Sequence, residues 1–512
     1  MGLPALFESF QNGPVAIFVS LFVVLLASYT IYQRQFHPLA KYAGPLICSL
    51  TDLYKMWATW NDRIPEEMIR LHEKYGDVVR IAPNDLHFNR LEAVNDIYKR
   101  GWQKGEFYKG FDQRNPGLFA EPDEGIHARR KRRFGANFSE KSIREYESII
   151  DSRYAVLRKQ LDRFAESQEV SDLRRYITYA IVDILGCLAF SQPLGNQHAE
   201  DPKKIPRVSE FLWANCVAGS APWLAPFLEW IRDHVPPSAE MAELLEGRNT
   251  VIRMASENIQ RRSAMPTEEP DILGRIIAAT EEGSGKKLSH DQIMAECIDL
   301  IVGGTHTTGN TLHLLFANLA RHPEYLQQCV EEIDRNLPAL SAEEPCYKIM
   351  GLEEKLEFVN ICILENFRKD PVGTFNMPRV VPIGGATIAG HFVPAGTQVS
   401  MNIHAFHHNK AVWGEDHGDF DPARWYDEKR AKGLESLVIP FSVGKRACVG
   451  QNLANANILK MFTTLLRCYE FEFVNSDEPM VVVSHGDSDL RTPVLVKVKM
   501  RGSEYTGAVP EE

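Results

Sequence analysis

The sequence lacks any paired arrangement of its cysteines. No two of them form a C-x-x-C pair or a spacing typical of a zinc finger. This scatter gives no support to a structural zinc site, and it is typical of reduced thiols in a domain that faces the cytosol. The nine cysteines stand at positions 48, 187, 216, 297, 329, 346, 362, 448 and 468.

Two further absences narrow the class of protein. The chain has 57 basic and 68 acidic residues, a net charge of −11, so no excess of positive charge indicates nucleic-acid binding. No internal repeat and no low-complexity linker divides its 512 residues. With 44% hydrophobic and 24% charged residues, the composition is that of a globular protein with a large core. We therefore expect one large catalytic domain over residues 46–500.

Helical periodicity dominates the chain beyond residue 46. Apolar residues recur at three- and four-residue spacing over Ile64 to Tyr75, Ser142 to Ser167, Leu173 to Leu188, Ala239 to Arg262 and Ser289 to Arg321. Alternation typical of strands is confined to Val78 to Ile81, Leu86 to Phe88, Ala386 to Phe392, Gln398 to Asn402, Val481 to His485 and Val494 to Val498. The pattern predicts a mainly α fold with small β-sheets, followed by a flexible tail over residues 501–512.

The N-terminus differs from the rest of the chain. Residues 14–32 carry no charge and are long enough to span a bilayer, so they predict a transmembrane anchor. A cleavable signal peptide is the alternative, but no basic segment precedes the run. The positive charges of Arg34 and Lys41 follow it, which favours a cytosolic catalytic domain and a short luminal segment over residues 1–13. Residues 33–45, rich in proline and glycine, predict a hinge.

One segment near the C-terminus is the most specific motif. Residues 441–450 read F-x-x-G-x-R-x-C-x-G and precede an apolar helical run from Leu453 to Leu466. A cysteine binds iron as the thiolate, whose charge is stabilised by the backbone N–H groups of a helix N-terminus. Cys448 stands where such a helix begins. A buried structural cysteine is the usual alternative, but the five-residue pattern favours a loop that presents one thiolate to a haem iron.

The other residues of the motif suit the same task. Gly444 permits the tight turn that directs the sulfur, and Gly450 lets the backbone approach a flat macrocycle. Phe441 would shield the sulfur from water. Arg446 is planar and always charged, which suits a haem propionate.

A second motif lies in the middle of a predicted long helix. Ser289 to Gln292 form a capping box that opens this helix, and Gly303 and Gly304 follow near its centre. Each glycine costs about 1 kcal/mol against alanine, so a packing or functional reason is expected. The hydroxyl of Thr307 can bond back to a carbonyl and loosen the helix further. The segment predicts either a ligand gap beside a flat cofactor or a kinked core helix.

These motifs, in this order, resemble the cytochrome P-450 superfamily of haem-thiolate monooxygenases. The hinge resembles that of microsomal members, particularly fungal ones. The resemblance implies haem b as cofactor with Cys448 as the axial ligand of its iron. It also matches Thr307 to the threonine that orders water and protons beside iron-bound dioxygen. His306 replaces the acidic residue of this signature and could still relay protons, because imidazole titrates near neutrality.

The resemblance assigns structural roles to a charged cluster. Glu365 and Arg368 stand at i and i+3 on one helical face, and Arg424 lies in the segment F-x-P-x-R-W further along. In the family such residues organise the face of the protein behind the cysteine without touching substrate.

The resemblance also implies contacts to the haem propionates. His127 and Lys131, four residues apart in a basic run, match the spacing of a propionate-binding pair, although a solvated helix face is the default for such a run. Arg379 matches a further propionate-binding arginine. The remaining arginines of the run would help to dock an acidic electron donor.

The resemblance implies a function in which a lipophilic small molecule gains one oxygen atom from dioxygen. Because the chain has no flavin or nicotinamide fingerprint, electrons would come from NADPH through a separate reductase, at the endoplasmic reticulum membrane. The alternatives are a haem-thiolate enzyme without net oxygen insertion, favoured by His306, and a haem-binding protein without turnover. Substrate contacts are expected from residues 107–119, 211–228 and 371–377. Fungal secondary metabolism, fatty-acid oxidation and xenobiotic oxidation remain open.

Overall fold

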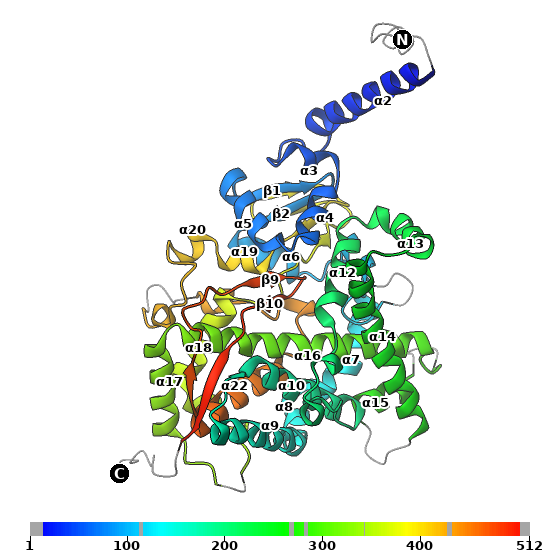
Figure 1. The fold of residues 1–512 in the computed structure, drawn as a ribbon. Helices are drawn as coiled ribbons and strands as arrows, with labels where there is room; N and C mark the ends of the chain where they lie inside the picture. Colours follow the sequence, from blue (N-terminus) through cyan, green and yellow to red (C-terminus); the bar gives the residue numbers. More distant parts are fainter. Residues whose placement is uncertain are drawn as a thin grey trace, which may run out of the picture.

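A computed structural model describes residues 14–111, 116–265, 271–280, 285–341, 344–427 and 433–501. The expected luminal segment, 1–13, and the expected tail beyond residue 501 lie outside this part of the chain. Helices make up most of the described residues, and the strands are short, as the periodicity predicts (Figure 1).

The helices up to residue 264 are α2 (Pro14–Ile31), α3 (Leu46–Leu50), α4 (Leu53–Trp60), α5 (Ile64–Tyr75), α6 (Leu91–Tyr98), α7 (Glu124–Gly135), α8 (Glu140–Glu145), α9 (Glu147–Ser167), α10 (Leu173–Phe190), α11 (Asn196–Ala199), α12 (Val208–Ser220), α13 (Ala225–His234) and α14 (Ala239–Ala264). The helices after it are α15 (Ile272–Ala278), α16 (His290–Ala320), α17 (Pro323–Asn336), α18 (Glu357–Lys369), α19 (Ile403–His407), α20 (Lys410–Trp413) and α22 (Gln451–Cys468).

The strands of the described residues form four small sheets. They are β1 (Val78–Ala82), β2 (Asp85–Phe88), β3 (Ser171–Asp172), β4 (Arg379–Val380), β5 (Ala386–Ile388), β6 (His391–Val393), β7 (Gln398–Ser400), β8 (Tyr469–Phe473), β9 (Val482–Ser484), β10 (Ser488–Leu490) and β11 (Leu495–Met500). A four-stranded sheet has the order β1-β2-β7-β4, with β2 and β7 parallel, and a three-stranded sheet has the order β3-β11-β8. β5 with β6 and β9 with β10 form two antiparallel hairpins.

The long helix α16 crosses the middle of the molecule and positions the site (Figure 1). Its capping box is formed as predicted, because the Ser289 hydroxyl accepts from the Gln292 backbone and the Gln292 side chain accepts from the Ser289 backbone. It packs against α10, α14, α18 and α22. Phe316 and Leu315 are fully buried in this core, and a buried side chain of this size contributes about 1.5–3 kcal/mol.

Two expectations about regular structure need correction. The strand pattern from Ala386 to Phe392 forms a hairpin rather than one strand, because Ala389 and Gly390 have φ of 46° and 84° and turn the chain between β5 and β6. The helical pattern from Ser142 to Ser167 is divided at Tyr146, which lies between α8 and α9.

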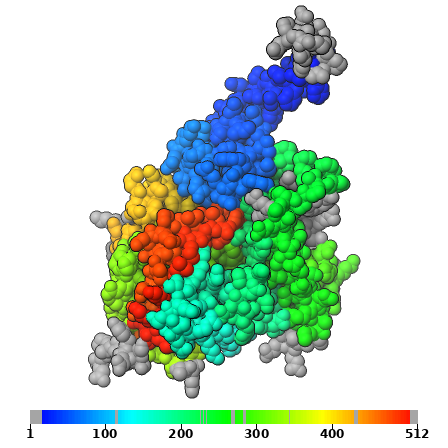
Figure 2. Space-filling model, in the orientation of Figure 1, coloured from blue at the N-terminus to red at the C-terminus, as the bar shows by residue number. Residues whose placement is uncertain are grey.

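The helix α2 stands apart from the body of the molecule (Figures 1 and 2). Its apolar side chains, among them Phe18 and Phe22, are exposed. By length and composition, residues Ala16–Phe36 meet the requirement for crossing a membrane.

Candidate functional site

A cavity of about 570 Å³ lies between α16 and the N-terminus of α22. Most of its lining is apolar, with a smaller share of polar and charged groups. That combination is typical of a site that encloses a cofactor and a small molecule. Cys448 lies on one wall, and Gly303, Gly304 and Thr307 of α16 also line it.

The cysteine loop directs its sulfur into this cavity. The backbone N–H of Cys448 donates to the Phe441 carbonyl oxygen over 2.8 Å, which closes the loop. The side chain of Cys448 is accessible although protein surrounds it, because its free surface faces the cavity. Burial raises the pKa of the thiol, but the backbone N–H groups of Gly450 and Gln451 donate to the sulfur and oppose that shift. This is the helix N-terminus that the motif predicts.

The two glycines and the phenylalanine of the loop each meet a different steric requirement. Gly444 has a φ of 74°, and a Cβ there would meet the carbonyl oxygen of Tyr98 at 2.6 Å. A Cβ at Gly450 would meet only the Cys448 sulfur, at 3.9 Å. The ring of Phe441 packs edge-on against Phe367 with centroids 5.3 Å apart. The loop can therefore approach a flat group closely from the side of Cys448.

The opposite wall comes from α16. A Cβ at Gly303 would meet nothing within 4 Å, whereas a Cβ at Gly304 would meet the Leu185 side chain at 2.7 Å. Gly303 thus opens the cavity, and Gly304 allows close packing with α10. The Thr307 hydroxyl donates to the Gly303 carbonyl oxygen over 2.9 Å, the back-bond expected from the sequence.

The structure corrects the expected placement of His306. This residue is not among those that line the cavity in the described part of the chain. At 3.6 residues per turn, one position along a helix turns the side chain by about 100°, so His306 faces away from Thr307. Its Nε2 lies 2.9 Å from the Ser209 hydroxyl, and its Nδ1 lies 3.7 Å from the Asp487 carboxylate.

All four residues assigned to the propionates line the cavity. Arg446, Arg379 and His127 all line it and are all buried. Arg446 donates to the carbonyls of Glu121 and Pro122 and to the Glu124 carboxylate. Burial and the nearby cations lower the pKa of His127 to about 3, so its imidazole is neutral and retains one N–H donor.

Lys131 makes a different contact from the one expected. Its ammonium donates to the carbonyl oxygens of Lys445 and Ala447, over 3.0 and 2.8 Å. In this structure it therefore braces the cysteine loop from α7, and its contact with a propionate stays a prediction.

The charged cluster assembles as expected, away from the cavity. Both Glu365 and Arg368 are fully buried, and Arg424 donates to the Glu365 carboxylate over 2.9 Å. The Trp425 indole and the Asp421 backbone donate to the same carboxylate. These contacts join α18 to the segment that precedes the cysteine loop.

Comparison with known proteins agrees with this site. The family model described as Cytochrome P-450 matches residues 41–500. The chain belongs to the cytochrome P-450 family. The curated relatives include cytochrome P-450 monooxygenase poxM of Penicillium oxalicum, 28% identical with 92% of each chain covered. Cytochrome P-450 monooxygenase cicH of Emericella nidulans is 30% identical, with 89% of this chain and 92% of the relative covered. Pisatin demethylase of Fusarium vanettenii is 26% identical, with 90% of each covered.

The cavity of this cytochrome P-450 fits the haem-thiolate cofactor of its family. A thiol held at a helix N-terminus faces a largely apolar cavity whose lining includes the buried cations Arg379 and Arg446. Cys448 would hold the iron, and Arg379, Arg446 and His127 would hold the propionates. The enzyme is an oxidoreductase of the monooxygenase class, as its relatives are.

Lys104 is a cavity residue that the sequence did not reveal. It is buried, it lines the cavity, and it forms no ion pair with a carboxylate within the described residues. Its ammonium donates to the Phe119 carbonyl and lies 4.3 Å from the centroid of the Tyr108 ring. Burial and the charges of Arg379 and Arg446 hold its pKa well below the usual range. Such a group gains most from an anion, so Lys104 is a further candidate for a propionate.

No sequence motif marks two further acidic residues of α16, which also line the cavity. The Asp299 carboxylate accepts from the Phe119 backbone over 2.8 Å, and Glu296 accepts from the Leu118 backbone over 3.2 Å. They tie the loop before α7 to the helix that lines the cavity. Burial, with a smaller effect of Asp299, raises the pKa of Glu296 to about 8.

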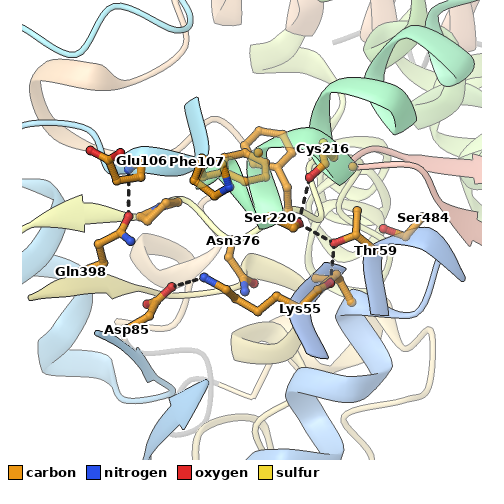
Figure 3. Close-up of a pocket in the computed structure, with 16 residues that line it drawn as sticks. Lys55, Thr59, Asp85, Glu106, Phe107, Cys216, Ser220, Asn376, Gln398 and Ser484 are labelled. Atoms are coloured by element: carbon orange, nitrogen blue, oxygen red, sulfur yellow. Dashed lines mark hydrogen bonds and ion pairs between the residues drawn. The ribbon is translucent and has the colours of Figure 1, made fainter. Parts of the chain in front are cut away.

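A second pocket, of about 40 Å³, lies between α4, α12 and the four-stranded sheet (Figure 3). The Lys55 ammonium pairs with Asp85 over 2.9 Å, and the hydroxyls of Thr59 and Ser220 are 2.8 Å apart. Phe375 lines both this pocket and the larger cavity. None of the motif residues lines the small pocket, so the chemistry belongs to the larger one.

Proposed function

We propose that this cytochrome P-450 inserts one oxygen atom from dioxygen into a lipophilic small molecule, with haem b as its cofactor. The observation that carries the proposal is that the Cys448 sulfur and the Thr307 hydroxyl face one largely apolar cavity. A haem with a thiolate ligand supplies the activation of dioxygen, because the thiolate pushes electron density that favours cleavage of the O–O bond.

The residues of this chain contribute binding, orientation and proton handling. Cys448 holds the iron, and the N–H groups of Gly450 and Gln451 stabilise its negative charge. Thr307 holds its hydroxyl at the opened part of α16, where it can order water at the reacting oxygen. The buried cations in the cavity lining offset the two negative charges of the propionates.

The apolar lining supports a lipophilic substrate. Side chains from all three segments expected to contact substrate line the cavity, including Phe111, Phe119, Phe211 and Phe375. The rings of Phe111 and Phe119 pack edge-on, as do those of Phe119 and Phe375. The relatives are fungal, and one is named a demethylase, which supports an oxidation in fungal secondary metabolism.

A membrane location is part of the proposal. The apolar helix α2 supports a single-pass anchor in the endoplasmic reticulum with the catalytic domain on the cytosolic side, where an NADPH-dependent cytochrome reductase would supply electrons. The helices α4 and α13 lie toward the end of the molecule from which α2 leaves (Figure 1). Both carry exposed apolar side chains, among them Trp57, Trp60 and Trp230.

Isotope-labelled dioxygen tests the function. The haem-loaded enzyme, a cytochrome reductase and NADPH are incubated with labelled dioxygen and each of three probes: benzoate, pisatin and a medium-chain fatty acid. One labelled oxygen atom in a product supports the proposal. With benzoate or the fatty acid, a product without label favours a haem-thiolate enzyme that rearranges or dehydrates its substrate. With pisatin, a demethylated product together with formaldehyde counts as insertion, because the inserted oxygen leaves with the methyl group. NADPH consumption equal to that without any probe, and no product, favours a haem carrier.

The cysteine ligand is tested separately. Cys448→Ala is expected to lose the absorption spectrum typical of a thiolate-ligated haem in the reduced, carbon-monoxide-bound protein. Cys468→Ala, which removes a cysteine remote from the cavity lining, is the matched control and should keep that spectrum.

A further inference from the structure

A row of polar side chains, called here the polar row, lies beside α16 on the face that carries His306. Ser209 of α12 donates from its hydroxyl to the Asp489 carboxylate over 3.2 Å, and the same hydroxyl lies 2.9 Å from Nε2 of His306. On the other side of the ring, Nδ1 of His306 lies 3.7 Å from the Asp487 carboxylate. Asp487 directly precedes the short strand β10, and Asp489 lies within it.

The two ends of the polar row lie in different surroundings. Asp489 pairs over 3.4 Å with Arg491, whose side chain is half exposed. Asp487 is buried and lines the same cavity as Thr307. The polar row therefore leads from the outer side of the β9–β10 hairpin to the interior of the cavity.

His306 has hydrogen-bond partners in both of its protonation states. When Nε2 carries a proton, it can donate to the Ser209 hydroxyl. When Nε2 is bare, it can accept from the Asn310 amide, whose nitrogen lies 2.9 Å away. A ring that is satisfied with and without its second proton can pass a proton at low cost.

The charges around the ring favour its protonation. Burial by itself lowers the pKa of His306, but Asp487, Asp489 and Glu210 outweigh burial and raise that pKa above its usual value. The imidazole is thus a source of protons near neutral pH.

We propose that Asp489, Ser209, His306 and Asp487 form a proton relay into the cavity, in which Asp487 is the carboxylate that delivers protons toward Thr307. This inference rests on the proposed function, because insertion of one oxygen atom consumes protons to convert the other to water. His306 is a positioning residue that acts through Asp487.

The relay moves one proton without any change of electrons. Nδ1 of the His306 imidazolium gives its proton to Asp487, which releases it to water in the cavity. The neutral ring then changes tautomer, because a water molecule takes the proton from Nε2 as it gives one to Nδ1. The bare Nε2 takes the Ser209 hydroxyl proton as Ser209 takes one from protonated Asp489, and solvent protonates Asp489 again.

The first experiment measures the pKa of His306 and needs no turnover. Histidine labelled with ¹³C at Cε1 is titrated by NMR in the reduced, carbon-monoxide-bound enzyme, and His306→Gln assigns the resonance. Asp487→Asn is expected to lower the pKa of His306. The control is Asp62→Asn, which breaks a second histidine–carboxylate pair of the same hairpin, His485 with Asp62 at 3.1 Å, outside the cavity lining. An unchanged pKa in Asp487→Asn would overturn the relay.

The second experiment measures how electrons from NADPH are divided between hydrogen peroxide and the oxidised product. With the probe that supports turnover in the wild-type enzyme, the ratio of hydrogen peroxide to product is expected to rise about 100-fold in Asp487→Asn, the low end for losing a proton-transfer group. Asp487→Glu restores the carboxylate and should bring the ratio back toward the wild-type value. A ratio in Asp487→Asn no higher than in Asp62→Asn would contradict the proposal.

A third variant guards against misfolding of the Asp487 variants. Ser209→Ala interrupts the relay outside the cavity and is expected to raise the same ratio, while Ser209→Thr keeps the hydroxyl and should not. Equal ratios for the two Ser209 variants would overturn the relay. If the wild-type enzyme turns over no probe, the proposed function fails on its own, and the NMR titration still judges the pairing of His306 with Asp487.

Discussion

The Glu365 carboxylate binds the Arg368 guanidinium through two parallel hydrogen bonds, from Nη2 over 2.8 Å and from Nε over 2.9 Å. Neither side chain has any exposed surface. The remaining Arg368 donors reach the carbonyl oxygens of His407, His417 and Asp419, so the buried charge is fully bonded. A pair satisfied in this way joins α18 to the segment that leads to Cys448.

Removing one partner of this pair should prevent haem incorporation. Glu365→Ala or Arg368→Ala leaves an uncompensated buried charge, which costs about 3–5 kcal/mol. We expect little soluble haem-loaded protein from either variant, measured as the ratio of haem to protein absorbance. The control is Lys141→Ala, which removes an exposed i,i+4 pair with Glu145 and should cost at most about 0.5 kcal/mol. A normal yield from the Glu365 variant would show that the cluster is dispensable.

Gly444 should tolerate no side chain. In Gly444→Ala the Cβ would lie 2.6 Å from the Tyr98 carbonyl oxygen, at a φ of 74° that already disfavours alanine. We expect the loop to shift and the enzyme to lose haem more quickly. Gly390→Ala is the matched control, because its φ is 84° but nothing lies within 4 Å of the added Cβ. It should cost only the backbone strain of about 1–2 kcal/mol and retain haem. Equal haem loss from the two variants would refute the steric explanation.

Lys104 should contribute to haem retention. Lys104→Met keeps the apolar stem but removes the charge that would bond a propionate, and a charged hydrogen bond is worth about 1.5–3 kcal/mol. We therefore expect haem transfer to an excess of a haem-binding acceptor to become at least about tenfold faster. Lys109→Met, which removes an exposed lysine paired with Glu106, should leave that rate unchanged. A wild-type rate of haem transfer in Lys104→Met would show that Lys104 serves only to bind the Phe119 carbonyl oxygen.

Glu296 should make stability fall as pH rises. Its pKa is about 8 in the folded protein, against 4.5 for an ordinary glutamate, so between these two values the folded state binds more protons than the unfolded state. The free energy of unfolding then decreases as pH rises through this window. In Glu296→Gln this decrease should become smaller, as measured by denaturant unfolding at pH 5 to 8. An unchanged slope would show that Glu296 is ionised at neutral pH through its contact with Arg130.

The local patterns were good predictors wherever one segment carried all the information. The periodicity of residues 64–75 predicts α5 with both of its ends, and the capping box predicts where α16 begins. The cysteine loop is equally local, because its turn, its N–H donors and its sulfur lie within eleven residues. Its family could therefore be recognised before any fold was known.

The roles of other residues depend on partners that are distant in the chain. Lys104 looks like any surface lysine in the sequence, and its burial beside Arg379 and Arg446 makes its charge unusual. In the sequence Glu296 and Asp299 look like ordinary helical acids. Only in the folded structure do the backbone N–H groups of residues 118 and 119 donate to their carboxylates. His306 was expected at the cavity and instead faces the β9–β10 hairpin.

The sequence by itself determined the family, the mainly helical fold and the residue that would hold the iron, because each depends on short-range spacing and backbone conformation. Tertiary structure decided which charges are buried together and which side chain delivers its carboxylate to the cavity. Burial and electrostatic coupling arise from groups that lie close in space. For His306 and Asp487, 181 positions apart in the chain, no local pattern could record that contact.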